Sequence, residues 1–214
     1  MKLEDIAEGV VRGEAQAVAS MTREALSAGL APEAILKDGL IAGMDLVGFR
    51  FKNNEIFVPE VLVAARAMKE GMRILEPLLA AAGVAPEGKV LIGTVEGDIH
   101  DIGKNLVITM LKGAGFEVID LGVNVSAGQF VSAVRTHRPQ VLGMSSLLTT
   151  TMVRMKHTVN ALSQAGLRDD IRLIVGGAPV TEAFALEIGA DGYGADAGAA
   201  RDRIRELIRL THGG

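Results

Sequence analysis

The chain has 214 residues, a length that allows one large domain or two small ones. Hydrophobic residues make up 49% and charged residues 22%, so a packed core is available and intrinsic disorder is excluded. The net charge of -4 argues against a nucleic-acid surface, and the absence of cysteine excludes disulfides, thiolate metal sites and cysteine nucleophiles. No uncharged apolar run is long enough to span a membrane, so we expect a cytoplasmic protein with neither nucleic acid nor membrane as a partner.

Apolar residues recur at helical spacing from residue 1 to about 82, and no stretch there alternates as a strand does. Gly13 and Gly29 are typical helix ends, while Pro32 and Pro59 suit the first turns of later helices. The pattern predicts a bundle of roughly four helices. Between the third and fourth helices we expect the segment 49–59 to form a turn that carries three of the six phenylalanines.

The small residues of segment 80–88, punctuated by proline and glycine, predict a linker between a helical domain (1–85) and a second domain (86–214). After the linker, short β-branched runs alternate with helical segments. Strands are predicted at 89–95, 117–121, 140–145, 171–175 and 192–193, and helices near 103–114, 127–137, 151–165, 180–188 and 196–211. This order predicts an α/β domain with a flavodoxin-like (Rossmann-like) sheet of five parallel strands, whose ligands bind beyond the carboxyl ends of the strands.

The loop after the first predicted strand reads Glu-Gly-Asp-Ile-His-Asp-Ile-Gly-Lys-Asn over residues 96–105 and lacks the glycine pattern of a dinucleotide site. In its D-x-H-x-x-G pattern, one nitrogen of His100 can point outward as a metal ligand while Asp98 holds the other nitrogen. Two simpler interpretations stay open from the residues alone. His100 can be an ordinary loop histidine with Asp98 as a helix N-cap, or the loop can hold zinc, although too few ligands are present for a usual zinc site.

Two further loops carry small residues. Serines and threonines follow the third predicted strand over residues 145–151, and Gly176-Gly177 follows the fourth. Each pattern alone is also typical of helix caps and tight turns.

Taken in order, the motifs D-x-H-x-x-G, S-x-L and G-G resemble those of the cobalamin-binding domain of corrinoid proteins. Residues 97–105 and 118–122 are similar to the corresponding stretches of cobalamin-dependent methionine synthase, and the Phe-Val-Pro-Glu-Val turn resembles the helical cap of that enzyme. The resemblance covers residues 1 to about 210 and leaves no segment for a catalytic domain. The chain is similar to the methyltransferase corrinoid proteins that carry methyl groups in methylamine, methanol and methoxy-compound metabolism.

The resemblance implies a cobalamin or related corrinoid whose tail is displaced from cobalt and enters the sheet domain. It implies His100 as the cobalt ligand, with Asp98 on the other ring nitrogen and Thr151, in place of the family's serine, extending this relay. The relay would store a proton when His100 leaves the metal. Further cofactor-binding positions implied by the family motifs are Asp101, Gly103, Ser145, Leu147, Thr149, Gly176 and Gly177.

The resemblance also implies that the helical cap covers the upper, methyl-bearing face of the corrinoid. Phe51, Val58 and Val61 fall on the shielding positions, with valine in place of leucine at 58; the alternative is that they are simple bundle core. The implied activity is that of a non-catalytic methyl carrier. It would receive a methyl group on cobalt, as methylcobalamin, from a substrate-specific methyltransferase and pass it to an acceptor-side methyltransferase, with a reductive activase as third partner.

Three other functions are alternatives. A cobalamin-binding sensor usually has a basic DNA-binding segment, and this sequence shows none. A mutase-type cobalamin subunit lacks a cap like residues 1–85, so the presence of that segment argues against it. A receiver domain without a corrinoid would need an acidic pair where this chain has Gly93-Thr94-Val95. No role beyond the surface is assigned to His137, His157 and His212.

Overall fold

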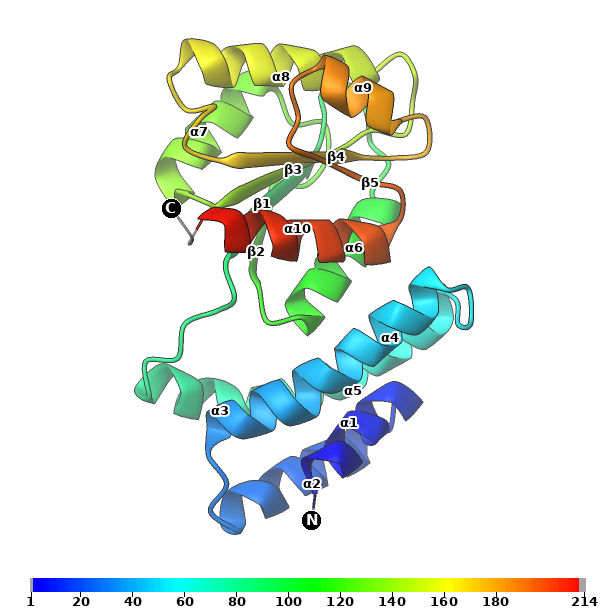
Figure 1. Cartoon of the computed structure of the whole chain (residues 1–214), viewed down its shortest axis with the longest axis vertical. Coiled ribbons are helices and arrows are strands. Elements are labelled where there is room, and N and C mark those ends of the chain that lie inside the picture. The colour runs from blue at the N-terminus through cyan, green and yellow to red at the C-terminus, as the bar shows by residue number, and fades with distance from the viewer. Residues whose placement is uncertain (1, 212–214) are drawn as a thin grey trace. The chain divides into compact units, whose positions relative to one another are not determined.

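The computed structural model describes residues 2–211, and the chain divides into two compact units, which Figure 1 shows in one view. The first, here called the helical unit, contains the residues up to Glu87 together with Lys112–Gly115. The second, the α/β unit, contains Gly88–Leu111 and the residues from Phe116 onward. No helix of the described chain is both long and apolar enough to cross a membrane.

The helices of the helical unit follow the predicted punctuation. They are α1 (Leu3–Arg12), α2 (Ala15–Ser27), α3 (Pro32–Ala34), the π-helical segment η1 (Ile35–Ile41), α4 (Ala42–Lys52) and α5 (Val58–Ala81). Gly13 ends α1 in the left-handed conformation at φ 71°, which glycine adopts without steric cost. Because α3, η1 and α4 follow one another without a break, the predicted third helix is present as one continuous element with an unpredicted π-helical section.

The prediction of a turn over residues 49–59 is wrong for its first part. Helix α4 continues to Lys52, so Phe49 and Phe51 lie on its last helical turn. Only the residues from Asn53 to Phe57 separate α4 from α5. The Glu60 carboxylate accepts a hydrogen bond from the Phe57 N–H at 3.0 Å, which satisfies one of the free donors at the start of α5.

The α/β unit alternates strands with helices. Its strands are β1 (Lys89–Thr94), β2 (Glu117–Asp120), β3 (Val141–Ser145), β4 (Arg172–Gly176) and β5 (Gly192–Gly194), and its helices are α6 (Ile102–Gly113), α7 (Ala127–His137), α8 (Met152–Gln164), α9 (Glu182–Glu187) and α10 (Ala197–Thr211). The strands pair in parallel in the order β2-β1-β3-β4-β5, which confirms the predicted sheet. The carboxyl ends of all five strands therefore lie at one edge.

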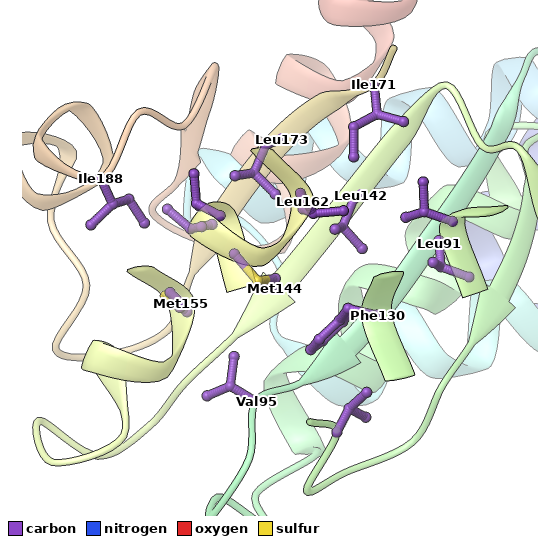
Figure 2. Packing of buried hydrophobic residues seen from close by; sticks show 14 of the residues in the cluster. Leu91, Val95, Phe130, Leu142, Met144, Met155, Leu162, Ile171, Leu173 and Ile188 are labelled. Atoms are coloured by element: carbon purple, nitrogen blue, oxygen red, sulfur yellow. The ribbon is translucent and has the colours of Figure 1, made fainter. Parts of the chain in front are cut away.

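The two faces of this sheet have different surroundings, because successive side chains of a strand point to opposite sides. Leu91, Leu142 and Leu173 share one face and pack with residues of α7, α8 and α9 into an apolar core, part of which Figure 2 shows. Phe130 of α7 and Leu162 of α8 are completely buried there. In Figure 1, α10 and α6 lie on the opposite side of the sheet from α8 and α9. This second face borders the site described next.

Candidate corrinoid site at the carboxyl edge of the sheet

The loop that joins β1 to α6 presents His100 at the carboxyl edge of the sheet. The Thr94 hydroxyl, fully buried at the end of β1, donates to the His100 carbonyl at 2.9 Å. Asn124, which follows β2, accepts a hydrogen bond from the Gly97 N–H at 2.7 Å, and its own N–H donates to the Asp98 carbonyl at 2.9 Å. The loop is thus held from two neighbouring strands.

Asp98 in this loop is fully buried and receives hydrogen bonds on both carboxylate oxygens. Its Oδ1 accepts from the backbone N–H of His100 at 3.0 Å and lies 2.8 Å from Nδ1 of the same residue. Its Oδ2 accepts from the N–H of Leu147 at 2.7 Å and from the hydroxyl of Thr151 at 3.0 Å. The structure therefore brings together Asp98, His100 and Thr151, the three residues of the implied relay.

These hydrogen bonds decide the charge of Asp98. Burial opposes ionisation, but the donors outweigh it and hold the pKa of the Asp98 carboxyl well below its usual range. The largest of the lowering contributions come from the backbone N–H groups of His100 and Leu147. Asp98 is consequently a carboxylate.

An ionised carboxylate only accepts hydrogen bonds, so Nδ1 of His100 must carry the proton in the contact with Asp98. In the neutral imidazole the lone pair then lies on Nε2, at the other end of the ring. The His100 side chain is 48% exposed, so Nε2 is available to a metal from outside. This arrangement fixes the ring and its tautomer, as second-shell carboxylates do for metal-ligating histidines.

The surroundings of His100 suit a broad apolar ligand. Ile99 and Ile102, its neighbours in the loop, are 74% and 82% exposed, and Leu147 and Leu148 of the loop after β3 are also exposed. Exposed apolar side chains gathered at one place indicate a binding surface. Among the described residues no group of three or more histidines, aspartates or glutamates is arranged to hold a metal ion, so a metal here would depend on His100 and on ligands of its own.

Beside His100 a cavity of about 650 Å³ extends between the sheet and the helices α6 and α10. Ser145, Leu147, Gly176 and Gly177 line it, together with Asp101 at the end of the loop and Gly103 in the first turn of α6. A side chain at Gly103 would meet nothing within 4 Å, so the glycine leaves open space there. The site therefore combines an exposed ligating nitrogen, an apolar rim and a channel into the protein.

Comparison with known proteins agrees with this geometry. Two family models, each described as a B12 binding domain, match residues 88–201 and residues 2–76. Trimethylamine corrinoid protein 2 of Methanosarcina acetivorans is 45% identical over 188 residues, which are 87% of each chain. A corrinoid protein of Desulfitobacterium hafniense is 38% identical over 209 residues, 96% of this chain and 97% of the relative.

The chain belongs to the corrinoid proteins with B12-binding domains. Solved structures extend the likeness to the fold. The crystal structure of a cobalamin-binding protein from Desulfitobacterium hafniense aligns with a TM-score of 0.81 at 31% identity, covering 96% of this chain and 98% of the other. A chain of the methanol:cobalamin methyltransferase complex of Methanosarcina barkeri aligns with a TM-score of 0.83 at 32% identity, covering 95% and 78%.

Three other predicted site residues of this corrinoid protein do not take part in the hydrogen bonds of the relay. Asp101 is exposed and ends the loop, where its Oδ2 accepts from the Asn105 side chain at 3.0 Å. Thr149 is exposed on the turn before Thr151 and does not border the cavity. Gly177 carries a structural constraint of its own, because a Cβ there would lie 1.8 Å from the Ser146 carbonyl oxygen. Their contacts with a corrinoid stay predictions.

The three predicted cap residues occupy different environments within the helical unit. Val61 on α5 is completely buried, Phe51 on α4 is half-buried, and Val58 at the start of α5 is 37% exposed. His137 and His157 lie exposed on α7 and α8, and His212 lies outside the described residues.

Sequence reasoning missed Thr94, Asn124 and Ser146. The Ser146 hydroxyl lies 2.7 Å from that of Thr151 and donates to Asp98 Oδ2 at 3.4 Å, whereas the predicted Ser145 faces the cavity. Alternation separates the two serines by face, but the path of the loop beyond β3 decides which hydroxyl meets Asp98. For Asn124 the usable signal was the residue type, because asparagine adopts the left-handed conformation of a tight turn more readily than most residues do.

Proposed function

We propose that this chain is a corrinoid-binding methyl carrier that receives a methyl group from a substrate-specific methyltransferase and delivers it to a second methyltransferase. The observation that carries the proposal is His100, which Asp98 holds through Nδ1 so that Nε2 is directed to a ligand. The relatives named as trimethylamine corrinoid proteins and the methanol:cobalamin methyltransferase complex support this assignment. When bound, the corrinoid supplies a cobalt centre that carries the methyl group.

The residues of the chain then have separate tasks. His100 would hold the metal through Nε2, and Asp98 with Thr151 would orient the imidazole and keep the proton on Nδ1. The exposed Ile99 and Ile102 would support the corrin ring, and the cavity between the sheet and α10 would receive the displaced tail. Residues 1–85 are proposed as the cap over the opposite face, with Phe51, Val58 and Val61 as shielding residues.

A carrier of this kind needs three partners. The two methyltransferases would need the same bound cofactor, so they would dock in turn. A reductive activase is proposed as the third partner, because a cofactor that became oxidised would need an external reductant. The similarity to a chain of the methanol:cobalamin methyltransferase complex supports a methyltransferase partner but says nothing of the activase.

The deciding experiment is electron paramagnetic resonance of the protein loaded with cobalamin and held as Co(II). With natural histidine, a coordinated nitrogen splits each line into three; with ¹⁵N-histidine, coordination by His100 gives two. The variant His100→Gln should lose the effect of the label, while His157→Gln, exposed on α8, should keep it. A splitting that does not respond to the label would show that the tail still binds cobalt, and the proposed site would be wrong.

A further inference from the structure

The cavity beside His100 follows one face of the sheet, so strand residues line it at two successive depths, here called the edge layer and the inner layer. At the carboxyl edge the register places Ser145 beside Gly176 and Gly176 beside Gly194. Two residues earlier in each strand, the register places Ile92 beside Gly143 and Gly143 beside Ile174. Since a strand rises about 3.3 Å per residue, this inner layer lies roughly 6–7 Å below the edge.

The two layers differ in chemistry. The polar side chains His100, Ser145 and Asp196 border the cavity near the carboxyl edge. Lys104 also borders it, but its ammonium group is engaged with Asp120 at 2.7 Å and with Asn105 at 2.9 Å.

The inner layer contains Ile92, Gly143 and Ile174, and the helices contribute the apolar side chains of Val107 on α6 and Ile204 on α10 to the cavity lining. These residues have no side-chain hydrogen-bonding group, and the strands that carry three of them are paired on both sides in the sheet. A ligand group that reaches this depth finds only apolar side chains.

We propose that the inner end of the cavity selects the tail base of the corrinoid, accepting an apolar benzimidazole and disfavouring a purine. This inference rests on the proposed function, in which the displaced tail enters the cavity. The far ring of a benzimidazole carries only carbon and hydrogen, whereas a purine brings ring nitrogens and an exocyclic amine. These groups would lose water without gaining partners, a loss that corresponds to about tenfold or more in affinity.

Gly143 gives the inner layer its room. A Cβ at this position would lie 3.2 Å from Cγ1 of Ile92 and 3.7 Å from Cγ2 of Ile174. The two isoleucines thus flank a slot with the glycine as its floor. Gly143→Ala would fill part of the slot and requires a shift of only a few tenths of an ångström at Ile92, so the fold can accept it.

The test compares three corrinoids on the purified, unloaded protein: cobalamin, its adenine-tailed analogue, and cobinamide, which has no nucleotide tail. Binding is measured by equilibrium dialysis with absorbance detection. We expect adenine-tailed corrinoid to bind at least about tenfold more weakly than cobalamin. Gly143→Ala should weaken cobalamin by about tenfold and leave cobinamide unchanged. Gly128→Ala on α7, where a Cβ meets nothing within 4 Å, is the matched control and should change none of the affinities.

Failure of base selection and failure of the proposed carrier function give different results. If the histidine label shows a displaced tail but both tailed corrinoids bind equally well, selection by the inner layer is wrong and the carrier proposal stands. Selection by the inner layer is also wrong if Gly143→Ala binds cobalamin as tightly as the unaltered protein does. If the label shows that the tail remains on cobalt, the proposed function itself fails, and with it the occupation of the cavity.

Discussion

Asp98 divides its two oxygens between two loops. Oδ1 serves His100, two residues along the chain, while Oδ2 serves Leu147 and Thr151 about fifty residues later. A single buried carboxylate therefore orients the metal ligand and ties the loop after β1 to the loop after β3. Leaving such a group short of donors is costly, because a buried charge needs nearly all its hydrogen bonds.

Asn124 is a positioning residue for this loop, and Asn124→Gly tests it without disturbing the backbone. The residue has φ 55°, which glycine adopts freely, so the variant removes only the side chain that accepts from the Gly97 N–H. We expect a loss of about 0.5–1.5 kcal/mol in the free energy of unfolding, measured with urea. In the cobalamin-loaded protein we also expect a smaller fraction of Co(II) with a histidine nitrogen in the resonance spectrum.

Asn54→Gly is the matched control for that variant. Asn54 has φ 58° and lies between α4 and α5, away from the loop of His100 in the chain. It should change the unfolding free energy by no more than a few tenths of a kcal/mol and leave the resonance spectrum as it was. If the two variants have the same spectrum, Asn124 does not position the cobalt ligand.

The loops after β3 and β4 depend on one another through Gly177. This glycine has φ 132°, and the neighbouring Gly176 carbonyl accepts from the Ser146 N–H at 3.1 Å. The close approach holds the segment whose N–H groups bind Asp98. The paired glycines, which the resemblance implies as cofactor-binding positions, thus also set the geometry of the relay.

Gly177→Ala should therefore disturb the site from the next strand. Its Cβ would overlap the Ser146 carbonyl oxygen, and the backbone conformation itself costs about 1–3 kcal/mol for a residue with a side chain. We expect the thermal midpoint to fall by several degrees and cobalamin affinity to fall with it. Gly128→Ala, in the first turn of α7 with free space around it, should leave stability unchanged or raise it slightly. Equal midpoints for the two variants would contradict the proposed role of Gly177.

Helix α6 is tied to the end of β2 by an ion pair between unequal partners. The Lys104 side chain is 1% exposed, whereas that of Asp120 is 39% exposed. Removing the aspartate leaves a buried ammonium without its counter-charge, but removing the lysine leaves a carboxylate that water can reach.

Asp120→Asn should consequently cost more than Lys104→Met. We expect losses of about 2–4 kcal/mol and of less than about 1.5 kcal/mol in the free energy of unfolding, since an uncompensated buried charge is the larger penalty. Urea denaturation of both variants, followed by circular dichroism, measures the difference. The reverse order would mean that Lys104 is solvated in a way that its burial does not allow.

The elements themselves were largely predictable because their signals are local. Alternation of short apolar runs with helical segments gave all five strands, and Gly13 and Pro32 marked helix ends through their own backbone preferences. The π-helical turns of η1 and the extension of α4 through Phe51 were missed, since both depend on packing within the helical unit. At the site, Asp98 and His100 could be found from their spacing, but Asn124 and Ser146 are brought to them only by the paths of distant loops.

The chain builds two cores from one composition that is poor in aromatic residues. Ile6, Val10 and Leu75 are completely buried in the helical unit, and Leu91 and Leu142 in the α/β unit. All the contacts described around His100 come from the α/β unit. Both parts of the chain nevertheless match family models described as B12 binding domains.

If residues 1–85 cover the upper face of the corrinoid, Phe51→Ala should open that face to small ligands. The measurement is the rate at which cyanide replaces water on bound aquocobalamin, followed by absorbance. Phe49→Ala is the control, because two residues along a helix point in nearly opposite directions and Phe49 is 57% exposed. We expect faster cyanide binding in Phe51→Ala than in either the control or the unaltered protein, with thermal midpoints checked for all three. Equal rates in the two variants would show that Phe51 belongs to the bundle core and shields nothing.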